Sequence, residues 1–119
     1  MHALMEERIL EALRAVVDPD FGVNIVDLGL VYAVGVLPDG GIFVQLTLRE
    51  PASPLNAPLV DEAEAAVRRA FPGNRAVYVQ LVWNPPWSPS MMSENARRAV
   101  ARQPIHRRRA GASIGCAAV

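Results

Sequence analysis

The chain has 119 residues, of which 51% are hydrophobic, so it forms one domain that buries roughly two-thirds of its unfolded surface. Twelve arginines balance twelve acidic residues, and the only cysteine is Cys116, which argues against a dedicated nucleic-acid binder and excludes an internal disulfide or a cysteine-cluster zinc site. Because no signal pattern opens the chain and no apolar run is long enough to cross a bilayer, we expect a cytoplasmic protein with no membrane association.

The first predicted element is a helix over residues 3–17. Its apolar residues recur at helical spacing: Met5, Ile9, Leu13 and Val16. We expect the helix to stop at Asp18-Pro19, because the residue before a proline avoids the helical region.

Residues 20–29 form a predicted loop in which Asn24 and Asp27 lie among apolar residues. The loop is too apolar to lie free on the surface, so we expect it to pack across one end of the domain. Asp27 needs hydrogen-bond partners if it is buried. Either it binds nearby backbone N–H groups and holds the loop, which is the commoner role, or it contacts a ligand.

Two strands are predicted at residues 30–37 and 42–48, joined by the hairpin turn Pro38-Asp39-Gly40-Gly41. In the second strand Ile42, Val44, Leu46 and Leu48 face the core, and Phe43, Gln45 and Thr47 face the other way. One face of the sheet is therefore expected to be apolar and covered, and the other half polar.

The turn after this strand contains Ser53 between Pro51 and Pro54, and the two prolines stiffen it. The next helix is predicted from the apolar spacing of Leu59, Ala63, Ala66, Val67 and Ala70. Ser53 either caps this helix, with Pro54 as the first helical residue, or forms a site where the helix start favours an anion or a thiolate. Pro58 complicates the start, so either Asn56 is the cap or the first turn is irregular.

A third strand is predicted at residues 76–83, and the proline-rich segment 84–89 that follows cannot be regular. Trp83 and Trp87 form a partner-binding ridge or pack beneath the proline loop. Met91-Met92 is more typical of a hydrophobic contact than of a metal site. Ser90 or Ser93 is expected to cap a last helix that runs to about Arg102.

The C-terminal segment differs in charge from the rest of the chain. Residues 97–119 hold six arginines and no acid, whereas residues 1–96 hold six arginines and all twelve acids. We expect a domain over residues 1–103 and a basic, disordered tail over residues 104–119. Cys116 in this tail resembles part of a prenylation box or supplies a mobile thiol.

The elements predict an α+β fold: a two-layer sandwich with a small mixed three-stranded sheet covered by helices, in the order α-β-β-α-β-α. No Ser-His-Asp order, phosphate loop or paired-carboxylate motif is present. The sequence therefore favours a protein that is not an enzyme.

Four segments together resemble the metal–sulfur cluster assembly domain of SufT-like and PaaD-like proteins, over about residues 5–102. They are Asp18-Pro19-Asp20, the run from Val23 to Tyr32, the turn from Pro51 to Pro54, and Trp83-Asn84-Pro85-Pro86-Trp87 followed by Met91-Met92. The resemblance implies a small α+β accessory protein for iron–sulfur protein maturation, often dimeric or bound to partner proteins.

The resemblance also implies site residues. The family's turn typically reads Pro-Gly-Cys-Pro, and its cysteine handles the metal or cluster, but Ser53 stands at that position here. Asn84 stands where the family has an acid. A serine hydroxyl is a poor ligand for an iron–sulfur cluster. We therefore expect an adaptor that holds no cluster at Ser53, with no confident cofactor, or alternatively a degenerate paralogue that acts as a non-metal interaction or regulatory module.

The expected partners are iron–sulfur apoproteins or their assembly machinery. The candidate contact residues are Asn24, Asp27, Trp83, Asn84, Trp87 and Met91. A homodimer is also expected, because the half-polar sheet face and the Trp87 loop would leave surface exposed in a monomer.

Overall fold

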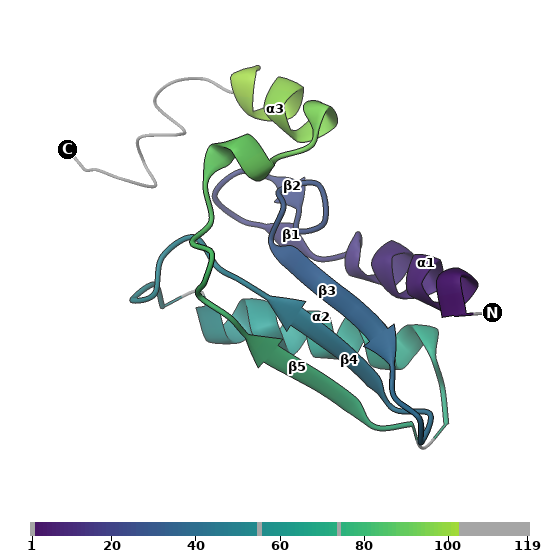
Figure 1. Ribbon diagram of the computed structural model, residues 1–119. Helices are drawn as coiled ribbons and strands as arrows, with labels where there is room; N and C mark the ends of the chain where they lie inside the picture. Colours follow the sequence, from purple (N-terminus) through teal and green to yellow (C-terminus); the bar gives the residue numbers. More distant parts are fainter. Residues whose placement is uncertain (1, 55, 74, 103–119) are drawn as a thin grey trace.

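The computed structural model describes residues 2–54, 56–73 and 75–102. Its elements in chain order are α1 (His2–Leu13), β1 (Val17–Asp18), β2 (Val23–Asn24), β3 (Val31–Val36), β4 (Ile42–Leu46), α2 (Asn56–Ala70), β5 (Val77–Leu81), the 3₁₀-helix η1 (Pro89–Met91) and α3 (Glu94–Ala101). Apart from the short β1, β2 and η1, this is the predicted order α-β-β-α-β-α (Figure 1). No helix in the described part of the chain is both long and apolar enough to cross a membrane.

The main sheet has the strand order β3-β4-β5 and is mixed, as predicted. β3 and β4 are antiparallel, and their hairpin closes where Leu37 N–H donates to the Gly41 carbonyl at 2.7 Å. β4 and β5 are parallel, with Ile42 opposite Val77. The helix α2 makes the crossover that parallel strands require. The carboxyl ends of β4 and β5 therefore lie at the same end of the sheet.

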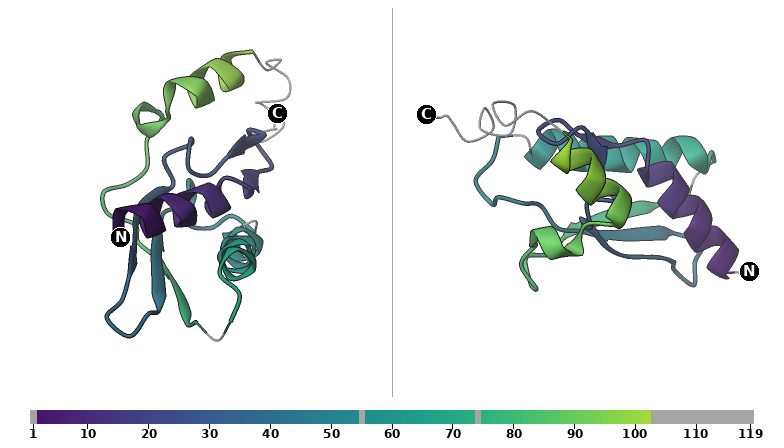
Figure 2. Two further views of the ribbon diagram at one scale, coloured as in Figure 1. Left: turned by 90° about the vertical axis from the view of Figure 1, so that its right-hand side faces the viewer. Right: turned by 90° about the horizontal axis from the view of Figure 1, so that it is seen from above.

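Two helices cover one face of the sheet, and the other face is open (Figure 2). α1 packs on β3 and on α2, and α2 packs on β5. The core between the layers holds the apolar residues that the two periodicities predict, including Ile9, Leu13, Ile42, Val44, Leu46, Leu48, Leu59, Ala63, Ala66 and Val67. The two-layer α+β architecture is confirmed.

The first helix is shorter than predicted, because α1 ends at Leu13 rather than at residue 17. After Leu13 the hydrogen bonds tighten to the i→i+3 type, as in Val16 N–H to the Leu13 carbonyl at 3.0 Å. Val17 and Asp18 then pair with Val23 and Asn24 in a small antiparallel ladder. β-Branched valines favour this extended conformation over a helical one.

Two details of the strand and helix predictions are wrong. Thr47, predicted on the polar face, is 0% exposed, because β4 ends at Leu46 and the alternation of faces no longer applies. The second helix begins at Asn56, so Pro54 precedes it and Ser53 does not act as its cap with Pro54 in the first helical position. Pro58 lies in the first turn, where a missing N–H costs little.

The last helix packs above the loop 17–29 (Figure 1). Its N-cap is Ser93, one of the two predicted candidates, whose hydroxyl accepts a hydrogen bond from Ala96 N–H at 3.1 Å. Ser93 N–H donates to the Asp27 carbonyl at 2.7 Å, which ties the helix to the loop. The predicted basic tail, with Cys116, lies outside the described residues.

Candidate functional site

The candidate site is a pocket at the end of the sheet where the loops after β4 and β5 meet. Its volume is about 240 Å³. Both loops reach it because β4 and β5 are parallel and end on the same side. The residues that line it are Asp18, Asp20, Leu48, Arg49, Glu50, Ser53, Asn56, Leu59 and Trp87.

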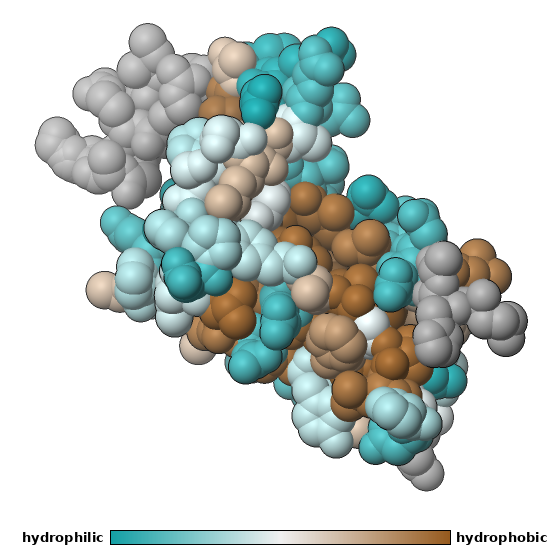
Figure 3. Space-filling view, viewed as in Figure 1, coloured by the Kyte–Doolittle hydropathy of each residue, from teal (hydrophilic) through white to brown (hydrophobic). Residues whose placement is uncertain are grey.

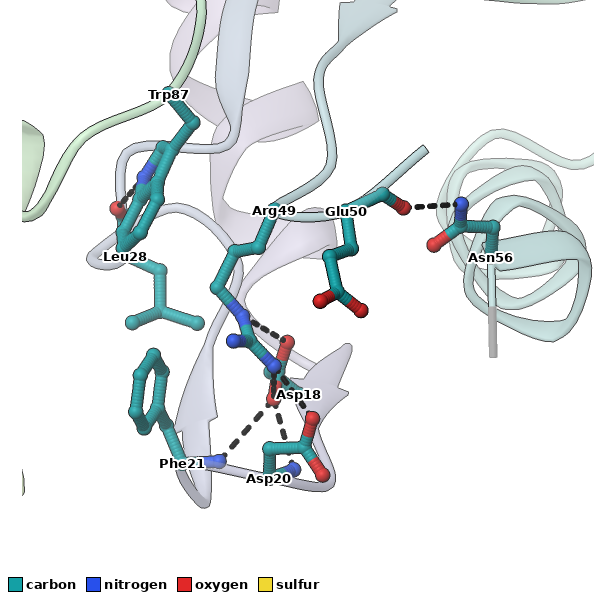
Figure 4. Close-up of polar contacts among 8 residues, drawn as sticks. All are labelled: Asp18, Asp20, Phe21, Leu28, Arg49, Glu50, Asn56 and Trp87. Carbon is teal, nitrogen blue, oxygen red and sulfur yellow. Dashed lines mark hydrogen bonds and ion pairs between the residues drawn. The ribbon is translucent and has the colours of Figure 1, made fainter. Parts of the chain in front are cut away.

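A buried aspartate and an arginine form the floor of the pocket (Figure 4). Asp18 is 3% exposed, and its Oδ1 accepts hydrogen bonds from Asp20 N–H at 2.8 Å and Phe21 N–H at 3.1 Å. Arg49 Nε donates to Asp18 Oδ2 at 3.4 Å, and Arg49 also pairs with Asp20. The guanidinium lies 4.4 Å from the centre of the Phe21 ring. The loop 18–22 and the end of β4 are thus held together by charge.

Ser53 lies on the wall of this pocket, in the turn between β4 and α2. Its N–H donates to the Glu50 carbonyl at 3.4 Å, and its carbonyl accepts from Asn56 N–H at 3.2 Å. The Asn56 side chain donates to the carbonyls of Glu50 at 2.7 Å and Pro51 at 3.1 Å. The Asn56 side chain therefore closes the turn.

The two tryptophans have different environments. Trp87 is half-buried against the core, and its indole N–H donates to the Leu28 carbonyl at 2.7 Å (Figure 4). Trp83 is 41% exposed. Trp87 therefore packs against the core and lines the pocket, whereas Trp83 lies on the surface.

Asn24 and Asp27 bind each other rather than the pocket. Asn24 Nδ2 donates to Asp27 Oδ2 and Asn24 Oδ1 accepts from Asp27 N–H, both at 2.9 Å. The side chain of Asp27 thus meets an amide side chain instead of the backbone N–H groups that we expected. Its role agrees with the loop-holding interpretation.

Met91 packs over the same loop. The hydroxyl of Tyr32 donates to the Pro85 carbonyl at 2.8 Å and lies 3.4 Å from Met91 Sδ. A Cβ added to Gly29 would lie 2.5 Å from the Met91 carbonyl oxygen. Of the two methionines, Met92 packs against the hydrophobic core, whereas the sulfur of Met91 meets the Tyr32 hydroxyl. Asn84, in the same loop, is exposed.

Of the predicted site residues, the structure brings only Ser53 and Trp87 to the pocket. Asn24, Asp27 and Met91 support the neighbouring loop, and Trp83 and Asn84 lie on the surface. Sequence reasoning missed the ion pairs of Arg49 with Asp18 and Asp20. The signal available was the segment Asp18-Pro19-Asp20, which carried the family resemblance but was interpreted only as a helix stop.

The chemistry of the pocket does not fit a resident metal or iron–sulfur cluster. Across residues 2–54, 56–73 and 75–102, no group of three or more His, Cys, Asp or Glu side chains is placed to hold a metal ion. Cluster iron takes thiolate ligands, and the pocket offers a hydroxyl at Ser53 and a guanidinium at Arg49 instead.

The fold and the pocket define a small two-layer α+β domain with a polar pocket at one end of its sheet. The chain belongs to the iron–sulfur cluster assembly protein family, whose family model matches residues 6–81. It is 41% identical to the Fe-S protein maturation auxiliary factor YitW of Bacillus subtilis, over 87% of this chain and all of that protein.

Two further proteins extend this comparison. The chain is 36% identical to the Fe-S protein maturation auxiliary factor SufT of Staphylococcus aureus, over 71% of this chain and 96% of that one. A crystal structure of a domain of unknown function, DUF59, from Bacillus anthracis aligns with a TM-score of 0.81 and 31% identity, over 86% of this chain and 96% of that one. The family resemblance and the fold are confirmed, and the curated relatives carry the names of auxiliary factors.

Proposed function

We propose that this protein is an accessory factor for the maturation of iron–sulfur proteins that acts through protein contacts and holds no cluster at residue 53. Its relatives YitW and SufT are named as maturation auxiliary factors, which supports the role. The absence of a cluster at residue 53 is supported by the pocket, where this residue is a serine that lies near the paired Arg49. A hydroxyl remains protonated there and binds iron poorly.

The contact surface that we assign to partners lies around Trp83 and Asn84, both exposed. Beside them, Leu81 borders a shallow, mostly apolar hollow of about 360 Å³ formed with the start of α2. Exposed aromatic side chains next to apolar hollows are typical of binding hot spots. The proposed partners are iron–sulfur apoproteins or their assembly machinery.

Anaerobic reconstitution with iron and sulfide tests the absence of a cluster. The protein with Ser53 is compared with a Ser53→Cys variant, and both carry Cys116→Ala, so the only thiol in the experiment is the one placed at residue 53. We expect no stable cluster absorption from the protein with Ser53. A protein that lacks Cys116 and still binds a cluster would overturn the proposal, because ligands other than residue 53 would then hold it.

Co-purification from cells tests the accessory role. We expect iron–sulfur apoproteins or assembly factors among the partners, and fewer of them with Trp83→Ala. The matched control is Arg14→Ala, an exposed residue directly after α1, which should leave the partners unchanged. A repeatable partner set without iron–sulfur proteins would favour the alternative function, a non-metal interaction or regulatory module.

We also propose a homodimer formed through the open face of the sheet. The strand register places Ala33, Gly35, Phe43, Gln45, Tyr78 and Gln80 on this face. Tyr78 is 52% exposed, and hydrophobic residues gather over β3 on the same side of the molecule (Figure 3). β5 carries no charged residue, although exposed edge strands are usually protected by charge. These features favour a covered surface.

Light scattering tests this dimer. We expect a dimer mass at high micromolar concentration and a shift toward monomer in Tyr78→Glu, since this change places a charge on the interface. The control Arg14→Glu places a glutamate at an exposed position directly after α1 and should remain dimeric. A monomer mass for the unchanged protein would reject the dimer.

The proposal also includes a cytoplasmic location and a domain boundary near residue 103. Fractionation of cells tests the location, and limited proteolysis tests the boundary.

A further inference from the structure

The pocket beside Ser53 combines three carboxylates with one guanidinium. Asp18, Asp20 and Glu50 line it together with Arg49, and Figure 4 shows the Glu50 carboxylate pointing to the same side as the guanidinium. Carboxylates are good ligands for hard and borderline cations. Without Arg49, the pocket would carry three negative charges and no positive one, so a cation held by a thiolate at residue 53 would be attracted by its surroundings.

Arg49 is held in this pocket from several sides. Its guanidinium pairs with Asp18 and Asp20 and stacks on Phe21. Its side chain is only 25% exposed, and that of Asp18 is 4% exposed. The Oδ1 atom of Asp18 also accepts hydrogen bonds from two backbone N–H groups. A metal ion could therefore reach these carboxylates only by displacing the partly buried guanidinium of Arg49. Its displacement would leave the buried carboxylate of Asp18 without a counter-charge.

We infer that Arg49 is the residue that determines the specificity of this pocket: it acts as an internal cation that occupies the acidic pair and excludes metal ions. This inference rests on the proposed function, in which the protein works without metal at residue 53. It adds that Ser53 is not the only barrier. A cysteine placed at residue 53 would still face a pocket in which Asp18 and Asp20 are already paired with Arg49.

The test compares Co²⁺ binding in four variants, each with Cys116→Ala. They are Ser53→Cys alone, Ser53→Cys with Arg49→Gln, Ser53→Cys with Arg49→Lys, and Ser53→Cys with Arg98→Gln. Gln keeps a hydrogen-bond donor beside Asp18 but removes the charge, and Lys keeps the charge. Arg98 pairs with Glu94 on the exposed surface of α3, so its variant is the matched control. Co²⁺ is titrated anaerobically, and its charge-transfer absorption reports a bond to the thiolate.

We expect the variant that combines Ser53→Cys with Arg49→Gln to bind Co²⁺ at least about tenfold more tightly than Ser53→Cys alone, because a positive charge is removed next to the thiolate. The variants that combine Ser53→Cys with Arg49→Lys or with Arg98→Gln should bind Co²⁺ with the same affinity as Ser53→Cys alone. Circular dichroism verifies folding, and Arg49→Met replaces Arg49→Gln if the latter does not fold.

Equal affinity with and without Arg49, an equal gain in the Lys variant, or no binding by any folded variant would each overturn the inference. None of these outcomes would affect the proposed function, which depends on the co-purified partners and on the protein with Ser53. Conversely, a cluster on the Ser53 protein would overturn the proposed function alone, whatever the Co²⁺ titrations give.

Discussion

A methyl group added at Gly29 should destabilise the packing beside the site. Gly29 has a φ of +84°, in the left-handed region, where a residue with a Cβ costs about 1–2 kcal/mol. A Cβ here would lie 2.5 Å from the Met91 carbonyl oxygen and 2.8 Å from Met91 Cβ. Because one of these atoms is backbone, the clash is relieved only if the segment around η1 moves.

That movement would weaken two hydrogen bonds that join the loop 17–29 to the C-terminal segment. These are Trp87 Nε1 to the Leu28 carbonyl and Ser93 N–H to the Asp27 carbonyl, both at 2.7 Å. Each is worth about 1 kcal/mol. Together with the backbone strain, we expect Gly29→Ala to lower the free energy of unfolding by about 3 kcal/mol, a large part of the stability of a small domain.

Gly40→Ala is the control, because Gly40 has a φ of +91° and no neighbouring atom within 4 Å of the added Cβ. It should lose only the strain, about 1–2 kcal/mol. Urea unfolding of both variants gives the two free energies, and the slope m should remain unchanged. If Gly29→Ala loses no more stability than Gly40→Ala, the contact with Met91 contributes nothing and the reasoning fails.

Three further changes test the packing around the pocket and the core. Trp87→Phe should cost about 1 kcal/mol through the lost indole hydrogen bond, whereas Trp83→Phe, at an exposed position, should leave the melting temperature nearly unchanged; equal shifts would contradict the different roles of the two rings. Ser93→Ala should cost about 1 kcal/mol by removing the cap of α3, seen as a lower urea midpoint, and an unchanged midpoint would mean that the cap is dispensable. Ile9→Ala should cost about 2–5 kcal/mol, because Ile9 is fully buried and the smaller side chain leaves a cavity; a loss below about 1 kcal/mol in the same assay would place α1 outside the core.

The repeated patterns of the sequence were enough to predict the layers of the fold. Leu59, Ala63 and Val67 are buried at the helical period, and Ile42 and Val44 at the strand period. In both cases one face of a regular element packs on the core, so the spacing of apolar residues along the sequence predicts which side chains are buried. The patterns fail where an element ends: Thr47 follows the alternation in sequence, but its strand has already stopped.

The pocket was less predictable, because its parts are far apart in the sequence. Nothing local pairs Arg49 with Asp18, and their contact depends on how the end of β4 lies against the loop after α1. Trp83 and Trp87 are equally apolar, and only the path of the proline loop buries one and exposes the other. Ser53 was found by its place in a motif and not by a physical pattern.

The parallel pairing of β4 with β5 has a consequence for the order in which the chain folds. The β3–β4 hairpin joins residues close in sequence, so closing it costs little chain entropy, whereas Ile42 meets Val77 only after α2 has crossed between them. Contacts of such long sequence separation form late. The pocket needs both the β4 and the β5 loops, so we expect it to be among the last parts to assemble. A newly made chain would then acquire its partner-binding surface only when nearly all of the domain has been synthesised.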